Sequence, residues 1–339
     1  MSRYITAHQS PEGPGDSRPR AIQIIEDEDL RLKLQGKSVF ITGANQGIGL
    51  ETARALHATG ATVYLGVRDL AKGQEAINDI LASETSTGAP LHLIKISLDS
   101  LQSVRDAANT LQSQTDKLNI LILNAGVMAT PEGRTVDGFE TQFGINHLSH
   151  FLLFRLLDPL LLAAVTPTFH SRVICVSSMA HRAGGIRFHD INFEEKGSYH
   201  PWVAYGQSKT ANIYMANEIE KRYGGKGLHA LSLHPGGIQT NLSQHLDQDT
   251  IAALGANPEL QKQMKSVAQG AATSVYAAVS KEWEGRGGRY LSNCIEQGPA
   301  AETSGSMSTD EGHAQWAYDE SAAAKLWAIS CEMVGLVEE

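Results

Sequence analysis

The sequence predicts an α/β fold, a single Rossmann-type doubly wound parallel sheet of about seven strands with helices on both faces. Three observations predict it. Short apolar runs alternate with longer stretches of helical periodicity along the 339 residues. The first apolar run leads through three glycines into a helical stretch. Most later apolar runs end in polar or small residues, as expected where parallel strands finish at one ligand-binding edge.

Residues 38–49 form the first strand, the turn and the start of the helix, and Gly43, Gly47 and Gly49 lie in this turn. One glycine permits the tight turn, one lets backbone N–H groups approach a pyrophosphate, and one lets the helix pack against the strand. The spacing is G-x-x-x-G-x-G rather than the common G-x-G-x-x-G. A dinucleotide site and a plain strand–helix connection are therefore both open on this pattern alone.

Six further strands are expected along the chain, at residues 61–67, 91–96, 118–123, 172–176, 228–233 and 288–293. The helices expected after the first are residues 70–81, 100–114, 139–162, 204–223, 257–281 and 322–334. A long insert at 179–203 precedes the helix 204–223. Residues 1–30 combine prolines and glycines with an acidic run, so we expect a flexible N-terminal extension to a single domain at residues 31–339.

Composition excludes several classes of protein. The 28 basic and 37 acidic residues give a formal charge of −9, so no basic surface for nucleic acid is expected. Cys175, Cys294 and Cys331 have no metal-ligand spacing and form no even disulfide set, which fits a reducing compartment. The longest apolar stretch, residues 151–165, is too short and too polar to span a bilayer, and the first 20 residues lack the apolar core of a secretory signal. A cytoplasmic protein without a membrane span is expected.

A tyrosine and a lysine point to proton transfer. Tyr205 and Lys209 are four residues apart and so share one face of a helix. A free phenol titrates near pH ~10, and an ammonium one turn away is expected to lower that pKa. The hydroxyl of Ser178, at the end of an apolar run, can hold and polarise a substrate oxygen. These groups suit the movement of a proton to or from a carbonyl oxygen while a nicotinamide carries the hydride.

Taken together and in order, the short motifs of the chain resemble the short-chain dehydrogenase/reductase family. The most similar branch contains the retinol dehydrogenases and the WW-domain-containing oxidoreductase, and the resemblance covers only their catalytic domain, from about residue 36 to 335. The matching motifs are residues 42–49 (TGANQGIG), 124–126 (NAG), 146–151 (NHLSHF), 176–178 (VSS), 205–209 (YGQSK), 234–236 (HPG), 269–273 (QGAAT) and 287–290 (GGRY).

The resemblance implies a role for each catalytic position. Tyr205 is expected to be the general acid/base, and Lys209 to lower its pKa and bind the nicotinamide ribose. Ser178 is expected to hold the substrate oxygen, since the family places this serine last in the Ser177–Ser178 pair. Asn146 is expected to maintain a water that relays protons through Lys209.

The end of the second strand favours NADP(H) as the cofactor. A carboxylate here usually binds the ribose diol of NAD, but this chain has Val67 followed by Arg68. A guanidinium can bind a 2′-phosphate that a carboxylate would repel, and Asn45 can add a polar contact. The neighbouring Asp69 is acidic, and its alternative role is to cap the next helix.

The full set of expected cofactor contacts spreads over the predicted strand ends. It is Gly43, Asn45, Gln46, Gly47, Ile48, Gly49, Arg68, Leu98, Asp99, Asn124, Ala125, Gly126, Tyr205, Lys209, Pro235, Gly236, Ile238 and Thr240. Three of these have a second account that stays open. Asp99 precedes Ser100, which can cap the next helix; Asn124 can close its strand; and Thr240 can cap the segment that follows it.

No metal site is expected. His147 and His150 flank Asn146 without a third ligand, and the histidines of the insert have no convincing metal spacing.

The expected substrate is a small hydrophobic ketone, aldehyde or alcohol, because apolar residues recur in the two segments that flank the site, 179–204 and 240–266. With NADPH the expected direction is reduction, and a ketoreductase of secondary metabolism is one reading. Tyr199 and Trp202 can form an aromatic wall or pack the insert. The alternatives to this enzyme are a dinucleotide-binding redox sensor or scaffold, and an epimerase or dehydratase on the same frame. A homodimer through helices 139–162 and 204–223 is a further expectation from the family.

Overall fold

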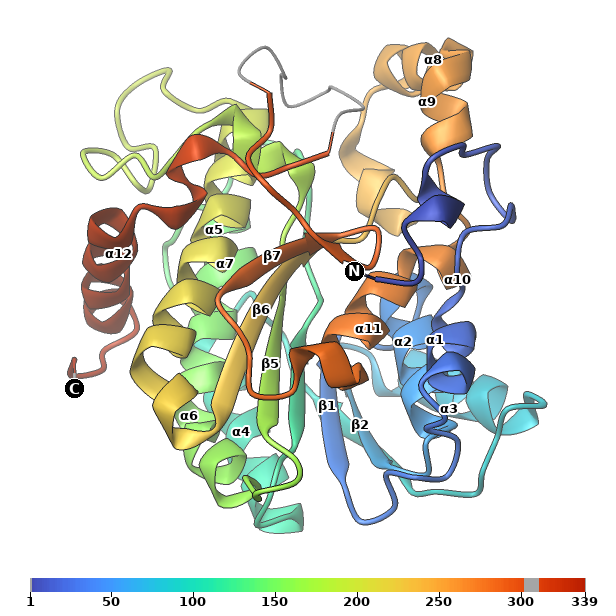
Figure 1. Ribbon diagram of the computed structural model, residues 1–339. Coiled ribbons are helices and arrows are strands. Elements are labelled where there is room, and N and C mark those ends of the chain that lie inside the picture. Colours follow the sequence, from blue (N-terminus) through green and yellow to red (C-terminus); the bar gives the residue numbers. More distant parts are fainter. Residues whose placement is uncertain (1, 302–310, 339) are drawn as a thin grey trace.

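The computed structural model describes residues 2–301 and 311–338, and within these ranges eight strands form one sheet (Figure 1). The strands are β1 (Ser38–Thr42), β2 (Thr62–Val67), β3 (Leu91–Lys95), β4 (Ile120–Leu123), β5 (Ser171–Val176), β6 (Leu228–His234), β7 (Arg289–Ser292) and β8 (Ile295–Glu296). Their order is β3-β2-β1-β4-β5-β6-β7-β8, and every neighbouring pair is parallel except the antiparallel β7–β8. The predicted fold class is confirmed, and the two-residue β8 is a strand that the sequence did not indicate.

Twelve α-helices lie in the described residues. They are α1 (Ala21–Asp27), α2 (Gly47–His57), α3 (Leu70–Ala82), α4 (Leu101–Gln114), α5 (Thr141–Phe143), α6 (Ser149–Ala163), α7 (Pro201–Tyr223), α8 (Gln248–Ala256), α9 (Pro258–Gln263), α10 (Val267–Gly270), α11 (Ala272–Val279) and α12 (Glu320–Met333). A π-helical turn, Gly144–Leu148, joins α5 to α6. The helix expected at 139–162 is therefore broken into three parts.

The sheet separates two hydrophobic layers, because alternate strand residues point to opposite faces. In β1, Val39 and Ile41 belong to the hydrophobic cluster that includes residues of α1, α2, α3 and α11, whereas Phe40 belongs to the cluster that includes residues of α4, α6, α7 and α12. These two groups of helices lie on opposite sides of the sheet in Figure 1. The chain passes from β3 at one edge back to β4 beside β1, which makes the β1–β4 boundary the switch point of the sheet. Ligands of open α/β sheets bind at this point, outside the carboxyl ends of the strands.

The C-terminal helix α12 covers α6 and α7, the helices through which a homodimer was expected. Its Trp327 is 3% exposed and packs edge-on against Phe151, with ring centroids 4.9 Å apart. The guanidinium carbon of Arg222 in α7 lies 4.7 Å from the Trp327 ring centroid on its other side. This part of the helix surface is therefore occupied by the chain's own C-terminal segment.

The N-terminal segment differs from the loosely attached extension that its composition suggested. Ile24 and Ile25 in α1 are fully buried, and Tyr4 packs edge-on against Tyr276 of α11. The N-terminal segment therefore contributes Tyr4, Ile24 and Ile25 to the same core as the sheet. Within the described ranges, every helix is too short or too polar to cross a membrane.

Replacing Ile24 by Ala is expected to lower the free energy of unfolding by about 2–4 kcal/mol, because a fully buried side chain is removed. The matched control is Ile251→Ala, at a residue that is 49% exposed, which should change it by less than about 0.5 kcal/mol. Urea denaturation measures both. Equal, small effects would mean that the N-terminal segment contributes nothing to the core.

Candidate active site

The glycine turn brings the start of α2 against the end of β1. Gly43 has φ +68°, and a Cβ on Gly49 would collide with the carbonyl oxygen of Gly43. Gln46, at the N-cap of α2, gives no side-chain bond to the helix terminus. The first N–H groups of α2 can therefore be satisfied by an anion, and the turn fits the pyrophosphate of a dinucleotide.

Polar bonds tie the end of β4 to this turn. The Asn124 amide donates to the carbonyl oxygen of Thr42 at 2.9 Å, and the Thr42 hydroxyl accepts from the backbone N–H groups of Asn124 and Ala125 at 3.0 and 3.1 Å. Asn124 thus closes its strand, which is one of its two predicted roles. Its position beside the glycine turn also fits the second role, a contact with the cofactor.

The π-helical turn presents Asn146 to the same edge. Its amide nitrogen donates to the Val127 carbonyl and to the Ser208 hydroxyl, both at 2.9 Å, and its carbonyl oxygen accepts from Val127 N–H at 2.8 Å. A Cβ on Gly126 would lie 3.0 Å from Asn146 Oδ1 and 3.5 Å from Lys209 Nζ. Asn146, Gly126 and Lys209 therefore adjoin one another, as the motifs suggested.

Tyr205 and Ser178 meet at the end of β5. The Ser178 hydroxyl is near enough to the Tyr205 phenol to influence its pKa, and Tyr205 is 3% exposed. The Ser177 hydroxyl instead turns inward and donates to the Lys209 carbonyl at 2.8 Å. Of the two serines, only Ser178 presents its side chain to Tyr205.

Lys209 lies one turn of α7 after Tyr205, with its Nζ 5.5 Å from the centroid of the Tyr205 ring. The ammonium donates to the Val176 carbonyl at the end of β5, at 3.1 Å. The four expected catalytic side chains are thus brought together, from the turn before α6, from the loop after β5, and from two positions of α7.

Burial dominates the protonation of this pair. It raises the pKa of Tyr205 to about 12, although Ser178 acts in the opposite direction, and it lowers the pKa of Lys209 to about 8. The sequence predicted a lowered tyrosine pKa because of the lysine charge. That prediction is wrong, because burial disfavours the phenolate more than Ser178 favours it, and burial also disfavours the charged form of Lys209.

The expected 2′-phosphate site lies at the end of β2. Arg68 is exposed there, and Asp69 caps α3 by accepting from the N–H groups of Ala71 and Lys72 at 2.9 and 3.3 Å. The capping account of Asp69 is confirmed. A cleft of about 330 Å³ adjoins the glycine turn, lined by Asn45, Gln46, Leu50, Lys72, Glu75, Ala76 and Asp79. The sequence analysis did not select Lys72, although its position four residues after Arg68 could have indicated a second cation near the expected 2′-phosphate.

The loop after β6 lies over the glycine turn. A Cβ on Gly47 would lie 3.6 Å from the Thr240 methyl carbon, and Asn241 donates to the Gln46 side chain at 2.8 Å. Thr240 also caps the short helix after it, accepting from Leu242 N–H at 3.3 Å. The two roles open for Thr240 are compatible in this geometry.

Four further residues expected to contact the cofactor are Ile48, Leu98, Asp99 and Ile238. Ile48 and Ile238 both adjoin Gly270, where an added Cβ would contact them. The carbonyl of Leu98 already accepts from the Ser149 hydroxyl at 2.6 Å, and Asp99 accepts from Val136 N–H through its backbone.

The loop that holds Ser178 is fixed by a histidine which sequence reasoning did not select. His181 Nδ1 lies 2.6 Å from the Ser178 carbonyl oxygen, and His181 Nε2 accepts from Ala314 N–H at 3.0 Å. Because one nitrogen must donate and the other accept, the ring is neutral, and burial lowers its pKa to about 4. Among the residues described, no three His, Cys, Asp or Glu side chains gather where they could hold a metal ion.

The two aromatic residues of the insert have different surroundings. Trp202 lies edge-on to Tyr205, with ring centroids 6.1 Å apart. The Tyr199 hydroxyl donates to the Thr130 carbonyl at 2.8 Å and accepts from Gln142 at 3.1 Å. Trp202 therefore adjoins Tyr205, whereas Tyr199 fixes the insert to the body of the domain.

Known proteins resemble this chain along nearly its whole length. A family model described as short chain dehydrogenase matches residues 37–190. The short-chain dehydrogenase/reductase prx1 of Penicillium roqueforti is 48% identical over 336 residues, covering 99% of this chain and 96% of that one. Retinol dehydrogenase 12 of Mus musculus is 37% identical, covering 90% and 88%. The crystal structure of an uncharacterized protein from Mycobacterium paratuberculosis, 34% identical, matches with a TM-score of 0.66 over 89% and 95% of the two chains.

Lys209→Met is expected to stabilise the protein at neutral pH. Burial lowers the lysine pKa from 10.5 to about 8, so the folded chain holds this proton less tightly than the unfolded chain does. The cost is complete below pH 8, shrinks between pH 8 and 10.5, and vanishes above that range. At about 1.4 kcal/mol per pKa unit, and allowing for the lost bond to Val176, the gain should be about 2 kcal/mol at pH 7 and much smaller at pH 10. Urea denaturation at the two pH values measures it, and a loss of stability at pH 7 would contradict the argument.

Proposed function

The chain belongs to the short-chain dehydrogenase/reductase family, as its motifs predicted, and from that premise we propose that it is an NADPH-dependent oxidoreductase. The proposed reaction is the reduction of a hydrophobic ketone or aldehyde, with alcohol oxidation as its reverse. The observation that carries the proposal is the buried Tyr205, with the Ser178 hydroxyl, Lys209 and Asn146 gathered beside it at the switch-point edge of the sheet.

When bound, a nicotinamide cofactor would supply a hydride for the carbonyl carbon. The Ser178 hydroxyl is near enough to influence the pKa of the Tyr205 phenol, so both hydroxyl groups can bond a carbonyl oxygen placed between them. With its pKa raised to about 12, Tyr205 stays protonated at neutral pH and can donate its proton as that oxygen becomes negative. Lys209, with a pKa of about 8, can exchange protons near neutral pH and return one to Tyr205.

Asn146 is positioned to assist the exchange of protons at Lys209. Its side chain is fixed by two bonds to Val127 and one to Ser208, and it adjoins Lys209 across Gly126. We assign it to hold the water through which Lys209 reaches solvent.

The cofactor preference rests on the charges at the end of β2. The acidic Asp69 is used as a helix cap, so the exposed Arg68 is the residue there that can meet a 2′-phosphate. Lys72 and Asn45 line the adjoining cleft and add a cation and an amide.

The substrate is proposed to be of moderate size and hydrophobic. Trp202 adjoins Tyr205 at the reacting position, and the Met264 sulfur adjoins Gly237 in the loop after β6, which is proposed to contact the cofactor. A ketoreductase of secondary metabolism is the cellular role we propose. A cytoplasmic location is supported by the three cysteines, all buried and unpaired.

Tyr205→Phe is expected to keep NADPH binding and to lower turnover of hydrophobic ketones by roughly 10²–10⁴-fold, since the proton donor is removed. The matched control is Tyr214→Phe, which removes another buried hydroxyl from the same helix, there bonded to the Trp316 carbonyl. It should keep turnover within about twofold. A panel of aldehydes and ketones, followed by NADPH oxidation, measures both, and unchanged turnover in Tyr205→Phe would refute the role of this residue.

Arg68→Ala is expected to lower kcat/KM with NADPH by about 10–100-fold and to leave kcat/KM with NADH nearly unchanged, because only NADPH carries the 2′-phosphate. Lys72→Ala should act in the same direction, more weakly. The control is Arg20→Ala, at an exposed arginine outside the site. A native enzyme that prefers NADH would overturn the assignment of the cofactor.

A further inference from the structure

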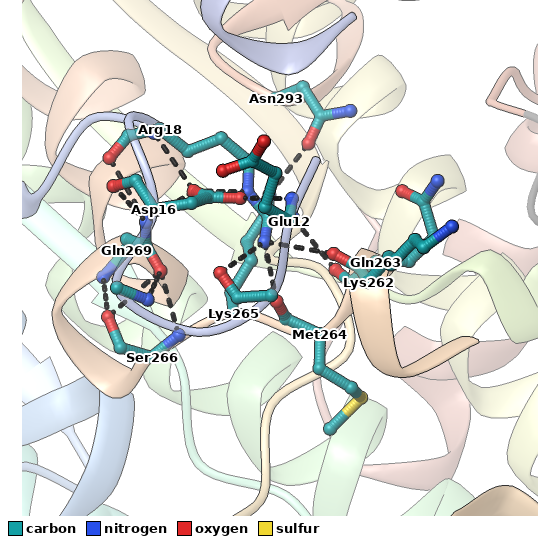
Figure 2. A network of polar contacts seen from close by, with 12 residues as sticks. Glu12, Asp16, Arg18, Lys262, Gln263, Met264, Lys265, Ser266, Gln269 and Asn293 are labelled. Atoms are coloured by element: carbon teal, nitrogen blue, oxygen red, sulfur yellow. Dashed lines mark hydrogen bonds and ion pairs between the residues drawn. The ribbon is translucent and has the colours of Figure 1, made fainter. Parts of the chain in front are cut away.

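The N-terminal segment and the segment before α11 bind each other through a buried polar network. Residues 13–18, called the N-terminal clamp below, lie against residues 262–269 (Figure 2). At its centre, Arg18 is 3% exposed and pairs with Asp16 at 2.9 Å. A buried pair of this kind is costly to desolvate and is stable only when further hydrogen bonds satisfy it.

Arg18 satisfies the end of α9. Its two terminal nitrogens donate to the carbonyl oxygens of Lys262, Gln263 and Met264, at 3.3, 2.8 and 2.6 Å. The last carbonyls of a helix have no partner within the helix, and a cation there also complements the helix dipole. Arg18 therefore fixes where α9 ends and in which direction the chain leaves it.

Gln269 holds the other side of the same segment. Its amide nitrogen donates to the Asp16 carboxylate at 2.9 Å, and its carbonyl oxygen accepts from the N–H groups of Gly15 and Ser266, each at 2.9 Å. Residues 264 and 265 thus lie between two anchors that both lead to the clamp, as Figure 2 shows.

These two residues support the loop after β6. The N–H of Lys265 donates to the Gly237 carbonyl at 2.8 Å, and its ammonium lies 3.3 Å from the Pro235 carbonyl and 2.6 Å from Asn293 Oδ1. The Met264 sulfur would lie 3.0 Å from a Cβ on Gly237. The clamp is therefore connected to the Pro235–Gly237 turn through residues 264 and 265.

We propose that Arg18 is a positioning residue for the nicotinamide half of the cofactor, acting through residues 264 and 265 on the loop at 235–240. The inference rests on the proposed function, which assigns Pro235, Gly236, Ile238 and Thr240 to cofactor contacts. The adenosine half meets the glycine turn and Arg68, which the clamp does not touch. Loss of Arg18 is therefore expected to weaken the nicotinamide half of the cofactor site more than the adenosine half.

The test compares two ligands in the full-length protein. NADPH occupies both halves of the site, whereas adenosine 2′,5′-bisphosphate occupies only the adenosine half. In Arg18→Ala we expect the dissociation constant of NADPH to rise about tenfold, as when a charged hydrogen-bond donor is lost, and that of the bisphosphate to stay within about twofold. KM for NADPH should rise more than kcat falls.

Two variants and one control accompany it. Arg18→Lys keeps the charge but not the fork of donors, so it should recover part of the NADPH affinity. Asp16→Asn removes only the charge of the partner and keeps its shape, which gives a milder test if Arg18→Ala does not fold. Arg20→Ala, two residues along, should bind both ligands like the native protein.

Three outcomes overturn the inference. They are an unchanged NADPH affinity in Arg18→Ala and Asp16→Asn, an equal loss of both ligands, and no recovery in Arg18→Lys. The failure of the proposed function is distinguishable from these, because it shows in the native protein as binding of neither NADPH nor NADH, and the inference then falls with it.

Discussion

The hydroxyl group of Thr42 connects the end of β4, beside the glycine turn, to the π-helical turn that carries Asn146. It accepts the N–H groups of Asn124 and Ala125, and it lies 2.9 Å from His150 Nε2. His150 Nδ1 lies 3.0 Å from the carbonyl oxygen of Asn146 in the π-helical turn. With Nδ1–H donating to that carbonyl, Nε2 is free to accept from Thr42, so the chain of bonds needs a neutral ring. Burial lowers the pKa of His150 to about 3, which keeps the ring neutral.

This connection explains how an edge built from separate strands acts as one site. Gly43 and Gly49 bring the start of α2 to the phosphate position, and Thr42, one residue earlier, relates that position to Asn146. The same edge buries an ionisable tyrosine and lysine side by side. Burial acts against the charged form of both, so the site holds a protonated phenol next to an amine that titrates near neutral pH. That arrangement suits the donation of a proton to a carbonyl oxygen, at a cost in stability typical of catalytic sites.

The sequence was most informative where the signal is local or where many short motifs agree. Apolar runs marked seven strands, and the residues at their ends marked the edge at which the site lies. Three features had no such signal. The π-helical turn at Gly144–Leu148 interrupts a stretch whose periodicity is helical throughout. The raised pKa of Tyr205 depends on burial that the spacing of Tyr205 and Lys209 does not show. The attachment of the N-terminal segment depends on Arg18 and on α1, whose partners lie far along the chain, 245 residues away in the case of Gln263.

The N-terminal segment and residues 257–270 have fixed positions because each satisfies polar groups of the other. Arg18 meets the carbonyls at the end of α9, and Gln269 meets Asp16. A proline- and glycine-rich composition is typical of mobile segments. Composition does not show long-range hydrogen bonds of this kind, which hold the N-terminal segment in place.

The central claim is that the site transfers a hydride to a carbonyl carbon while Tyr205 supplies the proton. The most direct measurement uses NADPH deuterated at the transferred position of C4, a hydrophobic ketone that the enzyme accepts, and mass spectrometry of the product. The account predicts one deuterium on the carbinol carbon and none when the label is in the solvent instead. Carbon-bound deuterium taken from D₂O, or product without the NADPH label, would contradict it and would favour epimerisation or dehydration on the same frame.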